Sequence, residues 1–323
     1  MYNSFHKLLY TFLLIFSICV INFFLFQLSP GDPTNSYFHP KARKESLAKR
    51  REQLGLNEPW RRQFYKWAIN ALHGNLGHSW AKHRPVFSIL KEAIPATLQL
   101  TITALLINFL VGVAAGLFAG VYAQRWWGRA LDISGLVFYA IPLFWLALLG
   151  VLLFSLILHW LPASGMSALN AQNFDAWGQL IDRIKHLLLP ATILGLAGAA
   201  GSARYVRGEI QEIFRQNYIK LARAKGLSRR SVYFKHALRN ALLPVITLFG
   251  LYFPFLLSGA LVIEVIFAWP GMGRIAYEAI LAKDYPVLMA VNLIAALMVI
   301  AGNTLADVLY RFADPRVMLK TTI

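Results

Sequence analysis

The sequence predicts an all-α, polytopic membrane protein with six transmembrane helices and cytoplasmic termini. The first observation is composition: of the 323 residues, 57% are hydrophobic and only 15% are charged, which is far from the balance of a soluble domain. The second is that uncharged residues form six long runs, each able to hold a helix of about 20 residues, enough to cross the hydrocarbon of a bilayer. The third is that these runs lack the polar stripe of helices in a soluble protein.

The six runs, in order, are Leu8–Gly31, Ala93–Gln124, Ile133–Phe174, His186–Ala203, Asn240–Ile263 and Tyr285–Ala306. We interpret the first as a retained anchor, because its apolar part is too long for a signal peptide and no A-x-A-like cleavage site follows it. The third is long enough for one span and an apolar extracytoplasmic loop, with Pro162 as an end marker. The fourth is short and rich in Gly and Ala, so we expect its helix to continue past Arg204.

The Lys and Arg residues of the short loops set the orientation. With a cytoplasmic N-terminus, the cytoplasmic segments carry sixteen of them and the short extracytoplasmic loops carry four. Residues 32–92 do not follow this rule, because this orientation makes them extracytoplasmic although they contain twelve basic and five acidic residues. Long translocated segments, however, are largely exempt from the charge rule. The expected organisation is an anchor at 1–31, an extracytoplasmic helical segment at 32–92, a transmembrane domain at 93–311 containing a cytoplasmic helix pair at 204–239 between helices 4 and 5, and a cytoplasmic tail at 312–323.

The segment 32–92 is too polar to span a membrane and shows helical order. KARKESLAKRREQLGL is a charged helix pattern. In NEPWRRQFYKWAINALHG, Asn57 is an N-cap candidate, Pro59 lies near the first turn and Gly74 suits the end. The segment reads either as a solvated lid or as a docking surface for an extracytoplasmic partner or anionic lipid, and charge alone does not distinguish these.

The chain carries no recognisable catalytic or ATP-binding motif, since serine-nucleophile patterns and H-E-x-x-H are absent. The lone Cys19 excludes an intramolecular disulfide and a multi-cysteine metal site. Three histidines recur at a five-residue spacing that does not align them on one helix face, which disfavours a metal site: His73, His78 and His83. Three glycines lack the Lys-Ser or Lys-Thr of a phosphate loop and favour close helix packing: Gly195, Gly198 and Gly201. We therefore expect no enzyme activity and no bound metal or cofactor.

The predicted spans hold almost no ionisable residue, which argues against a proton-coupled transporter and for an external energy source. Three asparagines are candidates to line a pathway: Asn108, Asn292 and Asn303. Interhelical hydrogen bonding is the alternative for each.

Between the fourth and fifth runs, the stretch Asn217–Pro244 reads as helix, tight turn, helix. Gly226 suits a C-cap and Ser228 an N-cap for a second helix at 229–238. Six apolar residues recur upstream at helical spacing and predict one apolar face: Ile210, Ile213, Phe214, Tyr218, Leu221 and Ala222. Tethering by membrane spans at both ends disfavours a DNA-binding motif. The pattern leaves open a lever that docks on a cytoplasmic protein and an interfacial helix on anionic lipid.

NYIKLARAKGLS followed by HALRNALLP closely resembles the cytoplasmic EAA loop of ABC importer permeases in the dipeptide, oligopeptide and nickel branch. Four further pieces resemble that branch: SPGDP at 29–33, REQLGLNEPW at 51–60, GNLGHSW followed by RPV at 74–86, and EVIFAWPGMGR at 264–274. Lys220, Leu221 and Ala222 depart from the Glu-Ala-Ala of the broad motif, although the peptide branch also has a basic residue where Lys220 stands.

The resemblance implies one of two homologous membrane subunits of a bacterial inner-membrane importer. It implies a partner permease, two ABC ATPase subunits that hold ATP and Mg, an extracytoplasmic solute-binding protein and surrounding membrane lipid, with no nucleic acid. The residues implied to dock on the ATPase are Tyr218, Lys220, Leu221, Ala222, Gly226, Leu227 and Ser228. The residues implied to form an extracytoplasmic gate loop are Glu264, Trp269, Pro270, Gly271 and Gly273.

The branch is compatible with dipeptides, oligopeptides, antimicrobial peptides, haem-like ligands and nickel, among which small peptides are the expected substrate. A function of a different class, an ATPase-independent channel or secondary transporter, is the alternative to an ATP-driven importer.

Overall fold

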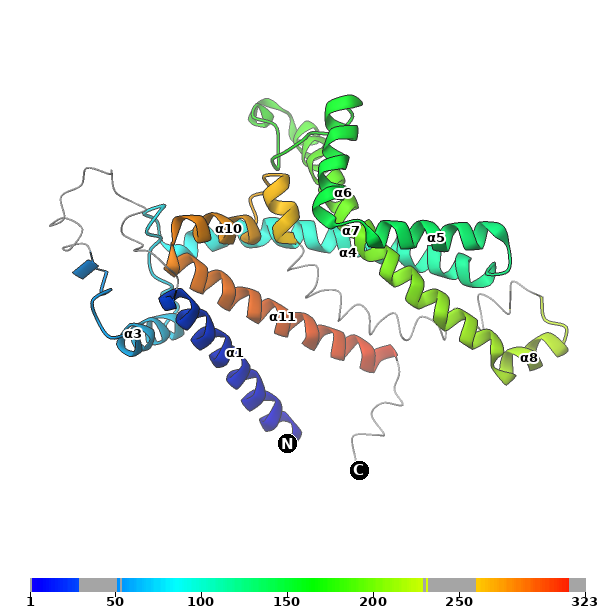
Figure 1. The fold of residues 1–323 in the computed structure, drawn as a ribbon, viewed down its shortest axis with the longest axis horizontal. Helices are drawn as coiled ribbons and strands as arrows, with labels where there is room; N and C mark the ends of the chain where they lie inside the picture. Colours follow the sequence, from blue (N-terminus) through cyan, green and yellow to red (C-terminus); the bar gives the residue numbers. More distant parts are fainter. Residues whose placement is uncertain (1, 29–50, 53, 229–230, 232–259, 314–323) are drawn as a thin grey trace. The chain divides into compact units, whose positions relative to one another are not determined.

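The computed structural model describes residues 2–28, 51–52, 54–228, 231 and 260–313, and every regular element in those ranges is helical. The elements are drawn in Figure 1, and their order is α1 (Tyr2–Leu28), α3 (Trp60–Leu72), α4 (Val86–Val121), α5 (Trp126–Ala140), α6 (Leu143–Gly150), the π-helix η2 (Val151–Ile157), the 3₁₀ turn η3 (Ala171–Asn173), α7 (Ala176–Arg215), α8 (Asn217–Ala224), α10 (Met272–Ala282) and α11 (Tyr285–Ala313). The prediction of an all-α protein is therefore confirmed for these ranges.

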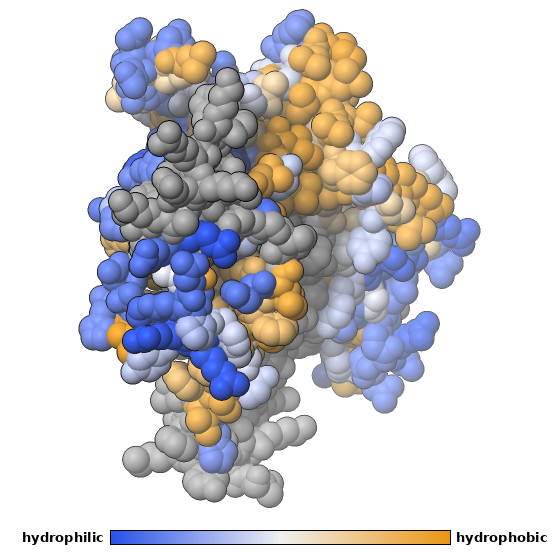
Figure 2. Space-filling view, turned by 60° about the vertical axis from the view of Figure 1, so that its left-hand side comes forward, coloured by the Kyte–Doolittle hydropathy of each residue, from blue (hydrophilic) through white to orange (hydrophobic). Residues whose placement is uncertain are grey.

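Within the described ranges, four stretches are long and apolar enough to cross a membrane: Leu9–Leu28, Val86–Val121, Ala176–Arg215 and Tyr285–Leu305. A fifth candidate consists of α5 together with α6 and η2, which pass the same test as one bent span. Hydrophobic side chains cover broad areas of the face seen in Figure 2, as expected for a surface in contact with lipid. The predicted run Asn240–Ile263 lies mostly outside the described residues, so the number six stays a prediction.

The third predicted span is a broken helix rather than one straight segment. Its two parts, 126–140 and 143–157, meet at a bend of 99°. At the break, Ile141 has extended backbone angles (φ −76°, ψ 128°) and Pro142 follows. A residue before proline is driven from the helical region by a clash with the proline ring. The helical part then ends at Ile157, and Pro162 lies in the loop beyond it.

The helix α7 is a single element of 40 residues that begins at a capped end and continues well past Arg204, as predicted. Its N-cap is Asp175, whose carboxylate accepts a hydrogen bond from the Gly178 N–H at 2.8 Å. At 1.5 Å per residue the helix is about 60 Å long, roughly twice the thickness of the hydrocarbon. The helix α7 is therefore long enough to cross the hydrocarbon and to extend beyond it to the start of α8.

The described chain forms two compact units, which divide α4 after Thr97 and α11 after Ile300. The first unit contains residues 1–97 and 270–300. Its core consists of small and aliphatic side chains from α4, α10, α11 and the loop before α4: Leu76, Val86, Ile89, Leu90, Ala93, Met272, Ala276, Ala279, Val287, Leu288, Ala290 and Val291.

In the second unit, residues 98–269 and 301–323, α4 and α7 cross where glycines leave room for backbone contact. A Cβ atom added to Gly116 would lie 2.5 Å from the carbonyl oxygen of Ala203, and one added to Gly195 would lie 2.7 Å from that of Ala104. We call this contact the glycine seam; its members are Gly112, Gly116 and Gly120 on α4 and Gly195 and Gly198 on α7. The sequence-based interpretation of Gly195 and Gly198 as packing residues is confirmed, whereas the GxxxGxxxG pattern of α4 was not recognised.

Candidate functional site

The candidate coupling site begins at the break between α7 and α8. Gln216 separates the two helices with an extended ψ of 146°. Its carbonyl oxygen accepts hydrogen bonds from the N–H groups of Ile219 at 3.1 Å and Lys220 at 3.3 Å, which starts the backbone ladder of α8. The second helix thus leaves α7 at a defined residue instead of continuing the same rod.

One side of α8 is buried against the second unit. Ile219 is fully buried and Ala222 nearly so. Both pack in a cluster with three residues of α7, Val206, Ile210 and Ile213. Partly buried side chains around this cluster come from the C-terminal half of α4 and the end of α7: Phe109, Val113, Leu117, Val121 and Phe214. This packing fixes α8 against both helices of the glycine seam.

The opposite side of α8 and the turn after it are exposed and apolar. Tyr218 is 41% exposed, Leu221 57% and Leu227 42%, and the exposed Lys220 and Lys225 flank them. The single apolar face predicted for residues 210–222 is therefore wrong. The break at Gln216 rotates Tyr218 and Leu221 away from the buried set, which a pattern assuming one continuous helix does not foresee.

The turn after α8 has the geometry that the sequence predicts for Gly226. This residue has φ of +75°, in the left-handed region that favours glycine. The N–H of Leu227 donates to the carbonyl of Ala222 at 3.3 Å, the long-range bond of a Schellman C-cap. A Cβ at Gly226 would meet nothing within 4 Å, so the requirement for glycine is conformational rather than spatial.

The Oγ of Ser228 accepts a hydrogen bond from the N–H of Ser231 at 3.3 Å, which is the contact expected of an N-cap. The predicted helix at 229–238 lies outside the described residues. Of the seven residues expected to dock on an ATPase, Ala222 faces inward and the other six lie on the exposed side or in the turn.

The predicted gate loop, 264–273, begins in the second unit. Glu264 and Trp269 have no exposed surface, and the Trp269 N–H donates to the Glu264 carbonyl at 2.8 Å. The loop before α7 covers this turn, since the Gly165 N–H donates to the carbonyl of Phe267 at 2.8 Å. The three other predicted residues belong to the first unit, where Gly271 caps α10: Pro270, Gly271 and Gly273.

Two of the three candidate pathway asparagines make interhelical hydrogen bonds. Asn108 of α4 is fully buried and its Oδ1 accepts from the Ser202 hydroxyl of α7 at 2.7 Å. Asn292 of α11 donates from Nδ2 to Oδ1 of Asn22 in α1 at 3.0 Å. Asn303 lies on the exposed surface of α11. Both contacts match the alternative reading of interhelical bonding.

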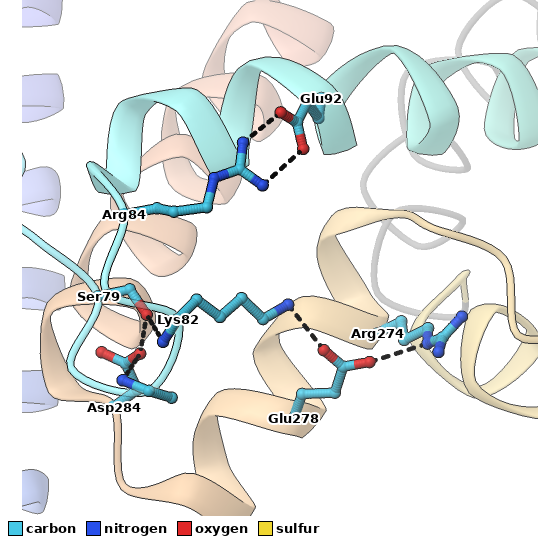
Figure 3. A network of polar contacts seen from close by, with 8 residues as sticks. Ser79, Lys82, Arg84, Glu92, Arg274, Glu278 and Asp284 are labelled. Atoms are coloured by element: carbon cyan, nitrogen blue, oxygen red, sulfur yellow. Dashed lines mark hydrogen bonds and ion pairs between the residues drawn. The ribbon is translucent and has the colours of Figure 1, made fainter.

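The GNLGHSW and RPV pieces form a loop that is held by a residue the sequence reasoning missed, Asp284. The Asp284 carboxylate is almost fully buried and accepts hydrogen bonds from the Ser79 hydroxyl, the Trp80 N–H at 3.1 Å and the Ala81 N–H at 3.2 Å. The same Ser79 hydroxyl accepts from the Lys82 N–H at 2.8 Å. Figure 3 shows the loop drawn onto the junction of α10 and α11.

Ion pairs surround this loop at its edge (Figure 3). Lys82 Nζ lies 2.9 Å from Glu278 Oε2, and Arg274 Nε lies 3.0 Å from Glu278 Oε1. Burial raises the pKa of the Glu278 carboxyl, but the hydrogen bonds and charges of Lys82 and Arg274 outweigh it, so that this pKa lies below its ordinary value. Arg84 pairs with Glu92 at the start of α4.

The comparisons with known proteins define the class. Residues 112–319 match the family "Binding-protein-dependent transport system inner membrane component", and residues 4–101 match the N-terminal part of such membrane components. The chain belongs to this family, whose members are multi-pass, non-catalytic membrane subunits of ABC transporters. Among the described residues, no group of three or more His, Cys, Asp or Glu is placed to hold a metal ion.

Several relatives match over nearly the whole chain. The oligopeptide transport system permease protein AppB of Bacillus subtilis is 36% identical over 305 residues, covering 94% of this chain and 95% of that protein. The glutathione transport system permease protein GsiC of Escherichia coli K12 is 37% identical over 309 residues, covering 95% of each.

Solved structures agree in fold. An inward-facing MetNI methionine ABC transporter matches with a TM-score of 0.57 at 17% identity, over 71% of this chain and 97% of that one. An amino acid ABC transporter crystallised with histidines matches with a TM-score of 0.51 at 16% identity, over 70% and 94%.

Proposed function

We propose that the chain is one of two homologous membrane subunits of an ATP-driven importer in the bacterial cytoplasmic membrane, and that it forms half of the translocation pathway for small peptides. Relatives named as oligopeptide and glutathione permeases support the substrate class. The observation that carries the proposal is α8, a short helix fixed on one side to α7 and α4 and exposing Tyr218, Leu221 and Leu227 on the other.

The proposed mechanism is alternating access driven from α8. Partner subunits bind and hydrolyse ATP with Mg, and their closure displaces the exposed face of α8. Because Ile219 and Ala222 are packed on α7, and α7 on α4, a displacement of α8 is passed to helices that cross the membrane. The ATPases can shift the equilibrium between the two states of the pathway only if they contact the states differently. In this mechanism they make that contact at the exposed apolar face of α8.

The proposal includes six spans, cytoplasmic termini and an extracytoplasmic helical segment at 32–92. It also assigns 264–273 to a gate at the extracytoplasmic mouth, as the resemblance of EVIFAWPGMGR to the peptide branch implies. The exposed Asn303 stays a candidate to line the pathway.

The coupling assignment is tested by Gly226→Val in the assembled transporter. A β-branched residue is strained at φ of +75°, so the turn shifts and the exposed face of α8 with it. We expect at least a tenfold loss of ATP-driven uptake in proteoliposomes, with the subunit still in the membrane and ATP hydrolysis retained. Gly208→Ala, in open space on α7, is the matched control, and wild-type uptake by Gly226→Val would contradict the assignment.

The substrate class is tested separately, by uptake of a peptide panel and of nickel in proteoliposomes with the cognate partners. Peptide uptake is expected, and transport of nickel alone would replace peptides by the second substrate of the branch. Copurification decides the remaining alternative, because a subunit that transports without any nucleotide-binding partner is a channel or secondary transporter.

A further inference from the structure

Helix α3, in the first unit, packs along α1 through its aromatic side. The Phe64 ring lies 6.0 Å from the ring of Phe16 and 5.4 Å from that of Phe23, both at edge-to-face angles. Trp67 adjoins Phe64 at 6.1 Å. Figure 1 shows α3 beside α1.

The level of this contact places α3 beside a membrane span. Phe16 and Phe23 lie within the apolar stretch Leu9–Leu28, and at 1.5 Å per residue they are about 18 Å and 8 Å from its end at Leu28. Only 6% of an 18-residue window of that stretch is buried within the chain, so most of the α1 surface is available for contact with lipid. Because the Phe64 ring contacts both Phe16 and Phe23, α3 lies against the Leu28 half of the span rather than in water beyond its end.

The exposed side of α3 carries three large apolar residues among its polar ones. Tyr65 is 65% exposed, Ile69 36% and Leu72 83%. Their spacing, i, i+4 and i+7, puts them on one stripe of the helix. A helix with a second apolar stripe that no described residue covers is unfavourable in water but suits the boundary between headgroups and acyl chains.

The charges of α3 are gathered near its first turn. Arg61 and Arg62 are exposed, and the Arg61 guanidinium lies 5.5 Å from the centre of the Trp60 ring. Lys66 is already paired with Glu58 at 2.6 Å. An exposed arginine pair beside an exposed tryptophan is the combination that favours contact with anionic headgroups.

We propose that α3 is an interfacial helix embedded in the leaflet at the Leu28 end of α1. In this position Tyr65, Ile69 and Leu72 insert among acyl chains, while Arg61 and Arg62 bind the phosphates of anionic phospholipid. In this way α3 holds the first unit at a fixed depth in the membrane, whichever substrate is transported.

The depth of α3 is measured in the full transporter, reconstituted in vesicles of phosphatidylethanolamine and phosphatidylglycerol. In a Cys19→Ala background, nitroxide labels are attached to Ile69→Cys, Leu72→Cys and, as the control on the other side of the same helix, Asn70→Cys. We expect labels at 69 and 72 to collide severalfold more with oxygen, and less with a water-soluble nickel complex, than the label at 70. Equal nickel access at the three positions, or protection of 69 and 72 only after a solute-binding protein is added, overturns the proposal.

The headgroup contact is measured by thermal unfolding of the detergent-solubilised transporter with added phosphatidylglycerol or phosphatidylcholine. We expect phosphatidylglycerol to raise the unfolding temperature of the wild type, and Arg61→Gln with Arg62→Gln to remove at least half of that rise. The matched control, Arg183→Gln with Lys185→Gln, removes two exposed charges from α7 and should leave the rise unchanged. Equal losses in both double variants contradict specific binding by α3.

Discussion

At the scale of single residues, Asp284 determines whether the loop 79–82 stays attached to the junction of α10 and α11. We expect Asp284→Ala to cost about 3 kcal/mol or more, because a buried Ser79 hydroxyl and the N–H groups of Trp80 and Ala81 lose a charged acceptor. Thermal unfolding of the purified protein in detergent measures this loss. Asp284→Asn keeps an acceptor and should lose less, and an alanine variant as stable as the wild type would refute the role.

The ion pairs of Glu278 predict a small dependence of stability on pH. Its pKa is lower in the folded protein than the ordinary carboxyl value, because Lys82 and Arg274 outweigh the effect of burial. A lowered pKa stabilises the fold fully above the ordinary value of about 4.3 and loses this contribution as pH falls through the folded value. Since both partners are more than a third exposed, screening limits the contribution to about 1 kcal/mol or less.

The check is the difference in unfolding free energy between the wild type and Glu278→Gln as a function of pH. The difference should be constant from neutral pH down to about pH 5 and vanish in stronger acid. A difference that grows on acidification has the wrong sign for this pair.

At the scale of elements, the glycine seam sets the distance between α4 and α7. We expect Gly116→Ala to destabilise the protein by about 1 to 3 kcal/mol, because its Cβ meets the backbone of Ala203 at 2.5 Å and one helix must move. Gly208→Ala, which meets nothing within 4 Å, should gain up to about 1 kcal/mol from its greater helix propensity. Parallel unfolding curves of the two variants test the seam, and a stable Gly116→Ala protein would show that the helices separate at no cost.

Local signals of the sequence located two helix ends correctly, those of α3 and α8. Gly74 and Gly226 adopt positive φ at or just beyond helix ends, and Ser228 caps the turn that follows, because these features depend on a few neighbouring residues. The helix α3 begins at Trp60 with Pro59 at the N-cap position, so Asn57 does not cap it. Pro142 is a local signal for the break after Ile141, but it lies inside an uncharged run that reads as one span. The break at Gln216 has no proline or glycine to mark it.

At the scale of the whole molecule, the proposed orientation predicts which side of the membrane each loop faces. In a Cys19→Ala background, a cysteine at the exposed Lys225 should react with a membrane-impermeant maleimide only from the cytoplasmic side, and one at the exposed Ser167 only from the other. Whole cells and inverted vesicles provide the two sides. Labelling of both positions from one side would contradict the topology.

The class of the protein could be predicted from the sequence, whereas most of its long-range contacts could not. Ordered motifs spread over most of the chain point to one transporter family, and the family match confirms them. The bond between Ser79 and Asp284 joins residues 205 positions apart, and neither position carries a pattern that periodicity or spacing can detect. Such contacts depend on how helices meet, which a single sequence does not encode in any local window.

The glycine seam also bears on the speed of rearrangement. Where two helices interlock through large side chains, sliding one past the other requires many rotamer changes, each with its own barrier. Gly112, Gly116 and Gly120 of α4 have no side chain to reorient, so at these three positions small axial shifts meet fewer rotamer barriers than between large side chains. The hydrogen bond from Ser202 to Asn108 must break and re-form when the helices slide. It therefore favours discrete relative positions of α4 and α7 over a continuous range.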